Sequence, residues 1–189
     1  MPVSRQYLYA TGANVSFAYN KDAVRFDVHL SQEHEVVAIA GNKNSMMALA
    51  ESCSFYATLD PKGKHEHDHW HTTDGSDAVE LVTSLDNSFT GGHSMIYDED
   101  DDEDVALIIN RPTILIEFPD PIDANIVLHP QATGRIDILA DNNGMAVMAN
   151  ALLRLLQFED ITEVYLIAEA DQAEWGFCLI RFVLQEPTK

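Results

Sequence analysis

Two segments of the chain carry apolar residues at helical spacing. In each segment they recur at intervals of three or four: Met46, Leu49, Ala50, Cys53 and Ala57 in the first, and Met145, Met148, Ala149, Leu152 and Leu156 in the second. This spacing predicts an amphipathic helix with one buried stripe. Asn42 and Asp141 stand just before the two segments and are residue types that cap helix N-termini. We therefore predict two helices and assign both methionine-containing stripes to core packing.

Short runs typical of strands frame each predicted helix. Two runs precede it and two follow it, at 24–30, 35–40, 65–73 and 78–85 around the first helix and at 125–129, 135–139, 162–170 and 176–184 around the second. One helix among four strands indicates an α+β fold, in which the helix covers one face of an antiparallel sheet.

Identical residues also recur at a fixed distance along the chain, in the same segments as the repeated hydrophobic pattern. Four pairs of identical residues are separated by a constant 99 positions (143 − 44 = 99): Ile39/Ile138, Asn44/Asn143, Met46/Met145 and Ala50/Ala149. Upstream, Val28/Val127 and Gln32/Gln131 keep this offset. We therefore predict two tandem β-β-α-β-β units, at residues 1–87 and 113–189, each an antiparallel sheet with one helix packed on one face. Residues 88–112 are expected to form an acidic connecting segment.

The first unit contains the stretch HEHDHWH, with a histidine at every second position from 65 to 71. The following DGSD places Gly75 and Ser76 at the centre of a tight turn, which suits type II′ geometry. This turn sets the expected strand register: His71 opposite Glu80, His69 opposite Val82, His67 opposite Ser84 and His65 opposite Asp86. The histidines then share one polar face, directed to solvent or to a partner. The other face, with Trp70, Val79, Leu81 and Leu85, is expected to pack beneath the helix.

A metal is one interpretation of the histidine row. At about 3.3 Å per residue, His65 and His71 lie roughly 20 Å apart, whereas zinc ligands all lie about 2.0–2.2 Å from one ion. Four histidines cannot share an ion, but His69, His71 and Glu80 form a candidate three-ligand set for zinc. The alternative is a metal-free row that faces solvent or contacts a partner. The corresponding strand of the second unit has no histidine, so an ion here would not be required by the fold.

The charge of the chain changes the expected partners. Eleven Lys and Arg face 31 Asp and Glu, which gives a net charge of −20. Such a surface repels phosphate backbones and attracts basic proteins, so direct nucleic-acid binding is not expected. Seven adjacent acids are expected to form a solvated, mobile loop. With His65 and His67 they are our candidates for partner contact: Asp98, Glu99, Asp100, Asp101, Asp102, Glu103 and Asp104.

Cysteine use and hydropathy indicate a cytoplasmic protein. Cys53 and Cys178 lack the CxxC spacing of zinc or redox sites, and we expect buried, reduced thiols. No stretch approaches the roughly 20 apolar residues of a membrane helix, and the N-terminal residues lack the apolar region of a secretory signal. We expect no membrane association.

Part of the first unit resembles a family of small bacterial immunity proteins for polymorphic or contact-dependent toxins. The resemblance covers roughly residues 36–85 and rests on four elements: Gly41-Asn42 at a strand end, the helix from Met46 to Ala50, His67-x-His69 or His69-x-His71, and Glu80-Leu81-Val82. The chain departs from that pattern by having Met where Leu is usual, four histidines rather than two, and Ala140-Asp141 without His-x-His in the second unit. The resemblance implies an intracellular inhibitor that binds its cognate toxin and has no catalytic activity.

The residues also favour a binding protein over an enzyme. The chain has no Gly-rich phosphate loop, nucleophile elbow or Walker motif. The leading hypothesis is an immunity protein that neutralises a basic nuclease toxin, because a nuclease site must be basic to hold phosphates. One alternative is a metal-binding protein or small metal-dependent hydrolase that uses His69, His71 and Glu80. Another is an acidic nucleic-acid mimic with other targets.

Overall fold

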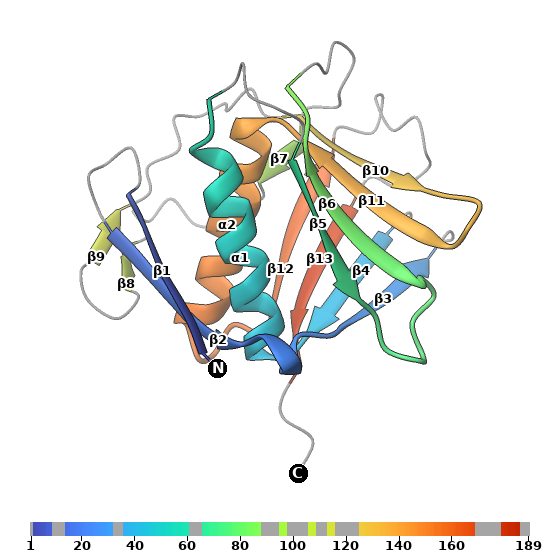
Figure 1. The fold of residues 1–189 in the computed structure, drawn as a ribbon, viewed down its shortest axis with the longest axis horizontal. Helices are drawn as coiled ribbons and strands as arrows, with labels where there is room; N and C mark the ends of the chain where they lie inside the picture. The colour runs from blue at the N-terminus through green and yellow to red at the C-terminus, as the bar shows by residue number, and fades with distance from the viewer. Residues whose placement is uncertain are drawn as a thin grey trace.

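The computed structural model describes residues 2–8, 14–31, 36–60, 66–87, 95–97, 106–108, 113–115, 125–168 and 179–185. Its helices are α1 (Lys43–Ala57) and α2 (Asn142–Gln157), with a short 3-10 helix, η1, at Lys21–Ala23. The two α-helices lie side by side, run in opposite directions and are flanked by the sheets (Figure 1). The α+β fold class is therefore confirmed.

The predicted order of elements occurs twice. The first unit consists of β3 (Phe26–Ser31), β4 (Val36–Gly41), α1, β5 (Glu66–His71) and β6 (Glu80–Leu85). The second consists of β10 (Ile126–Pro130), β11 (Arg135–Ala140), α2, β12 (Glu163–Ala168) and β13 (Leu179–Leu184). The bounds of β4 and β11, and those of β6 and β13, differ by the same 99 positions as the repeated letters.

The two large sheets differ from the expected ones in how their strands pair. Their strand orders are β3-β4-β13-β12-β7 and β10-β11-β6-β5, so each sheet takes one hairpin from each unit. The hairpins are antiparallel, but β4 pairs with β13, and β6 with β11, in parallel. The expectation that each unit forms an antiparallel sheet of its own is wrong at these two central pairs. The alternation of side chains within a strand predicts which face of the strand is buried. It does not predict whether the neighbouring strand comes from the same unit or from the other one.

The described part of the chain has five further strands that the sequence pattern did not predict. β1 (Pro2–Leu8) and β2 (Asn14–Asn20) form an antiparallel pair beside α1 (Figure 1). Phe17 and Tyr19 of β2 are buried in the core. β8 (Ala106–Ile108) pairs with β9 (Thr113–Leu115). Within the predicted connecting segment, β7 (Met95–Tyr97) pairs antiparallel with β12. This segment therefore contributes a strand to one sheet, which its composition did not predict.

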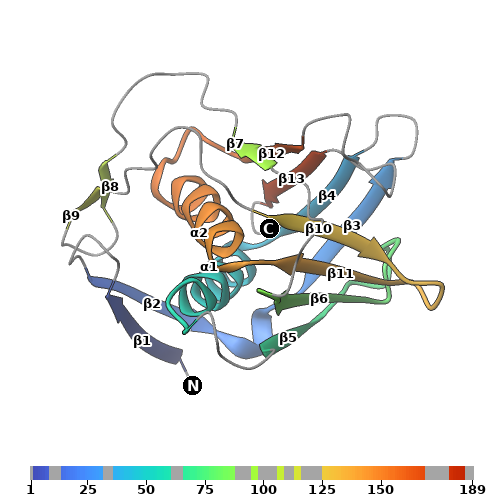
Figure 2. The ribbon, with the colours of Figure 1, turned by 90° about the horizontal axis from the view of Figure 1, so that it is seen from above.

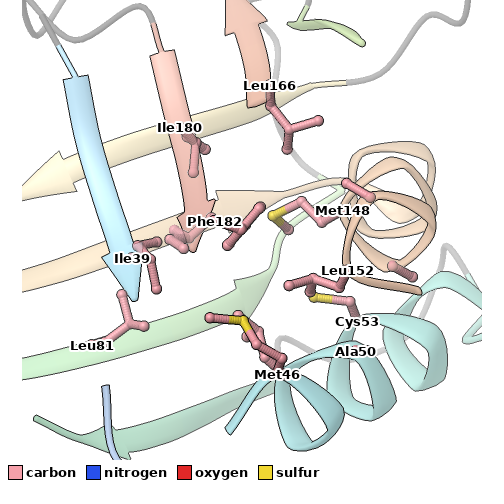
Figure 3. Close-up of a cluster of buried hydrophobic side chains, with 14 of the residues drawn as sticks. Ile39, Met46, Ala50, Cys53, Leu81, Met148, Leu152, Leu166, Ile180 and Phe182 are labelled. Carbon is pink, nitrogen blue, oxygen red and sulfur yellow. The ribbon is translucent and has the colours of Figure 1, made fainter. Parts of the chain in front are cut away.

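Both helices and both sheets contribute to one hydrophobic core. The methionine stripes are buried as expected, with Met46 and Met145 fully inaccessible and Met148 1% exposed. Figure 3 shows side chains from the two helices and the two sheets pointing to a common centre: Met46, Ala50 and Cys53 from α1, Met148 and Leu152 from α2, Leu81 from β6, and Ile39, Leu166, Ile180 and Phe182 from the five-stranded sheet. Burial of these groups couples the two units, because neither has a separate core.

Both predicted helix caps are confirmed. The side chain of Asn42 accepts a hydrogen bond from the backbone N–H of Ser45 at 3.0 Å, and that of Asp141 accepts one from the N–H of Gly144 at 2.7 Å. These bonds satisfy N–H groups that have no partner within the helix itself.

Candidate functional site

The histidine-rich strand β5 has the predicted register. His67 lies opposite Ser84, His69 opposite Val82 and His71 opposite Glu80. All three histidines are exposed, as expected, and His65 lies outside the described residues. We call the surface formed by His67, His69, His71 and Glu80 the histidine face.

The turn that was used to derive this register is different from the expected one. The N–H of Ser76 donates to the carbonyl of Thr73 at 3.0 Å, so Asp74 and Gly75 occupy the turn centre. Among the described glycines only Gly134 has a positive φ, 84°, whereas a type II′ turn would require one at Gly75. The predicted register is nevertheless correct, because the connection between the strands is longer than expected by the same number of residues on each side of its centre. This connection pairs with the edge of β3 through the N–H groups of Thr73 and Asp77.

The opposite face of the hairpin is buried except at one predicted position. Leu81 and Leu85 are in the core, and Trp70 packs against it with an edge-on contact to Phe26 at 5.8 Å between ring centroids. Val79 is 70% exposed, so its assignment to the core was wrong. β6 begins one residue later, at Glu80, and the alternation of the strand does not extend to Val79.

The candidate zinc ligands come together only in part. His69 Nδ1 lies 2.8 Å from Glu80 Oε1, and the rings of His67 and His69 are in edge-on contact at 5.0 Å between centroids. Among the residues that the structure describes, no group of three His, Cys, Asp or Glu side chains is arranged to hold a metal. The geometry provides a hydrogen-bonded His–Glu pair at the predicted place, without His71 as a third ligand.

A pocket of about 400 Å³ lies beside β5, between this strand, α1 and the segment from β2 to β3. β5 lies next to α1 and this segment in Figure 2. Its lining includes all six residues of β5, so the pocket extends along the whole strand. The other lining residues are Tyr19, Lys21, Val24 and Arg25, together with Ala48, Glu51, Ser52, Phe55 and Tyr56 of α1. We call it the β5 pocket.

Polar side chains of α1 and β5 meet in the wall of the β5 pocket. Ser52 Oγ donates to Asp68 Oδ2 at 2.5 Å, and the hydroxyl of Tyr19 donates to Glu51 Oε2 at 2.5 Å. Burial, then the charge of Asp68 and a hydrogen bond to it, raise the pKa of Tyr56, so this phenol remains a donor at neutral pH. The wall therefore presents two carboxylates held by hydroxyl donors, an arrangement suited to binding a cationic group.

This cluster was missed by the sequence analysis, although a signal for it exists. Glu51, Ser52 and Tyr56 are polar side chains in the largely apolar part of α1 that begins at Met46, and in the fold Glu51 and Ser52 are only 4% and 7% exposed. Their importance depends on Asp68 of β5, which lies next to α1 only in the folded chain.

The Gly-Asn element of the family resemblance has a structural role at the start of α1. A Cβ atom on Gly41 would lie 2.7 Å from Cβ of Ser45, closer than side-chain carbons approach one another. Asn42 caps the helix, as described above. These two residues fix how β4 leads into α1, which in turn positions the wall of the β5 pocket.

Other predicted features fall in three groups. The acidic run from Asp98 to Asp104 and Cys178 lie outside the described residues. Cys53 is buried and free, as expected, and burial followed by the charge of Asp68 raises the pKa of its thiol. None of the helices in the described part of the chain is both long and apolar enough to cross a membrane.

Comparisons of the chain with protein-family models, with curated proteins and with solved structures found no match.

Proposed function

We propose that this protein is a cytoplasmic, non-catalytic inhibitor that binds and neutralises a basic protein toxin of the nuclease class. The observation that carries the proposal is the position of the histidine face. Three exposed imidazoles lie on the last described strand of a sheet, beside a pocket whose lining includes Glu51, Glu66 and Asp68. A sheet edge with an adjacent pocket can receive an extended segment of a partner.

Charge supports the same proposal. A net charge of −20 raises the encounter rate with a basic partner and opposes the binding of nucleic acid. A nuclease toxin carries a basic substrate site, so its charge complements that of the inhibitor. The resemblance of residues 36–85 to immunity proteins gives the partner class, while the pocket and the histidine face give a surface for it.

The direct test uses the gene next to the one that encodes this chain. An immunity protein is expected beside a toxin gene, and the two products should co-purify as a complex. We expect the isolated toxin domain to cleave nucleic acid and the complex to be inactive. A neighbouring product that neither binds this chain nor loses activity with it would contradict the proposal.

The acidic run provides a kinetic test of the charge component. Replacing all seven acids from Asp98 to Asp104 with Asn and Gln should slow association with the toxin and flatten its dependence on salt, because these charges act over about a Debye length, roughly 8 Å at physiological salt. Stopped-flow association at two salt concentrations measures both effects. Identical rates and salt slopes for the two proteins would show that the run has no role in partner capture.

A further inference from the structure

The strands β5 and β12 occupy equivalent positions in the two units but have different neighbours. Asp68 pairs with Thr83, and Val164 pairs with Phe182, which stands 99 positions after Thr83. β12 is followed in its sheet by β7, which pairs antiparallel with Leu166, Ile167 and Ala168. In the described part of the chain, β5 is the last strand of its sheet. Figure 2 shows β7 alongside β12 and β5 at the far side of the molecule.

The β5 pocket lies where an additional strand would pair. A strand of six residues is roughly 20 Å long, and all six residues of β5 line the pocket. On the other side α1 provides Phe55, which at 37% exposure is one of two large hydrophobic residues exposed in the described part of the chain. The pocket therefore combines the edge of a strand with an exposed aromatic side chain, as surfaces that bind extended peptides do.

The two ends of the β5 pocket carry opposite charges. Glu66 and Asp68 lie at the N-terminal end of β5, with Glu51 on the adjacent helix. At the other end Thr72 bridges Phe26, which brings the preceding residue, Arg25, beside the C-terminal end of β5. An antiparallel segment would begin near Arg25 and end near Glu66. It should therefore carry an acidic side chain near its start and a basic one near its end.

From these observations we propose that the β5 pocket binds an extended segment of the partner protein as an added antiparallel strand, with a Lys or Arg side chain directed to Glu66 and Asp68 and an apolar side chain against Phe55. β7 on β12 is the example of this pairing within the same molecule. The proposal rests on the proposed function only for the identity of the partner, since the recognition mode follows from the pocket.

The test uses a phage-displayed library of random linear dodecapeptides, selected on the full chain. We expect enriched peptides with alternating polar and apolar residues and with Lys or Arg in their C-terminal half. Selected peptides are then synthesised and their affinities measured by fluorescence anisotropy. Failure to enrich any sequence, or enrichment without the basic position, would overturn the proposal.

Two matched pairs of variants locate the binding site. Phe55→Ala should weaken binding of the selected peptides about tenfold, whereas Val79→Ala, at the other exposed large hydrophobic residue, should not. Glu66→Lys should weaken it more than Asp74→Lys, which makes the same charge change at an exposed residue outside the pocket. Equal losses within a pair would mean general hydrophobic or charge attraction, and would overturn the assigned site.

Hydrogen exchange distinguishes the possible occupants of the edge. The selected peptide should slow amide exchange in β5 and leave β12 unchanged. Protection of β5 in the free monomer to the level of β12 would show that another part of this chain covers the edge. A dimer in sedimentation that dissociates with Phe55→Ala would assign the edge to a second copy. Either result would overturn the proposal, and neither depends on whether the neighbouring gene encodes a toxin.

Discussion

The two units of this protein share one backbone arrangement and differ in what their helices present to the adjacent strand. At the 99-residue offset, Glu51, Ser52, Phe55 and Tyr56 of α1 correspond to Asn150, Ala151, Arg154 and Leu155 of α2. On the strands, Asp68 corresponds to the buried Val164. The first unit therefore has two carboxylates, two hydroxyls and an aromatic ring at these positions, with Ser52 of α1 hydrogen-bonded to Asp68 of β5 beside the β5 pocket. The second unit has an amide, a guanidinium and aliphatic side chains there, so the fold does not require the Ser52–Asp68 pair, and the α1–β5 junction is the candidate for function.

The starts of the two helices show the same backbone requirement met in two ways. In the first unit Gly41 ends the strand and Ser45 lies in the first helical turn; in the second the corresponding residues are Ala140 and Gly144. A Cβ on Gly144 would lie 2.4 Å from the carbonyl oxygen of Asn125 and 3.1 Å from Cβ of Ala140. Each unit thus has a glycine on one side of a close contact between strand end and helix. The sites differ in which partner lacks the side chain.

The largest expected effect concerns the shared core. Leu152 of α2 and its counterpart Cys53 of α1 are both fully buried. Leu152→Ala should lower the free energy of unfolding by about 2–5 kcal/mol, because it leaves a cavity, whereas Cys53→Ala should cost about 1 kcal/mol. Urea unfolding followed by circular dichroism measures both values.

The same experiment tests whether the two units are energetically coupled. In a Trp175→Phe background, Trp70 of the first unit is the remaining tryptophan. Since both units contribute to one core, Leu152→Ala in the second unit should shift the fluorescence midpoint of Trp70 together with the circular dichroism midpoint. Two separate transitions would show that the units unfold independently.

The next largest expected effect concerns the contact between strand end and helix, where the glycine is Gly41 in the first unit and Gly144 in the second. Gly41→Ala should destabilise the protein by about 1–3 kcal/mol, because the added Cβ meets that of Ser45. The triple variant Gly41→Ala, Asn42→Asp, Ser45→Gly reproduces the second unit and should be more stable than Gly41→Ala alone. As the control, Ser45→Gly alone should be less stable than wild type, because Ser45 Oγ donates to the carbonyl of Arg25 at 2.6 Å. If the triple variant were no more stable than Gly41→Ala, the residues of the second unit could not replace those of the first at this contact.

The local sequence pattern was sufficient to predict several of the features that the two units share or differ in. The stripes beginning at Met46 and Met145, the caps Asn42 and Asp141, and the exposed row of His67, His69 and His71 all follow from residue spacing within one element or one hairpin. The hairpin register was correct although its turn was not, because pairing depends on where the connection is centred and not on its length.

Features that depend on distant segments could not be predicted in this way. The parallel pairing of β4 with β13 and of β6 with β11 joins strands from different units, and each strand alone has the same alternation with either neighbour. The β5 pocket likewise requires β2, α1 and β5 to meet. Phe17 and Tyr19 alternate in β2 and were a usable strand signal, but the sequence between β1 and β2 lacks a short hairpin motif, and the pairing of β1 with β2 was missed.

The smallest expected effect concerns a difference between the outer faces of the two sheets, at equivalent positions on β5 and β12. His67 of the histidine face and Glu163 of β12 are equivalent, since they pair with Ser84 and Val183, which are 99 positions apart. Glu163 accepts hydrogen bonds from the hydroxyl of Tyr165, at 2.6 Å, and from Arg181. The bond from Tyr165, followed by that from Arg181, lowers the pKa of the Glu163 carboxyl below its ordinary value.

A lowered pKa in the folded protein stabilises it at pH values above the ordinary pKa of glutamate, about 4.3, and this contribution is lost as the pH falls through the folded value. Glu163→Gln should therefore be less stable than wild type at pH 7, and the difference should disappear in acid. It should remain below about 1 kcal/mol, because the side chains of Glu163 and Arg181 are 35% and 40% exposed. Thermal unfolding at several pH values measures the difference, with Glu159→Gln, an exposed glutamate after α2, as the charge-matched control. If the two variants showed the same pH dependence, the effect would come from net charge, and the outer face of the second unit would have no specific stabilising network to distinguish it from the histidine face.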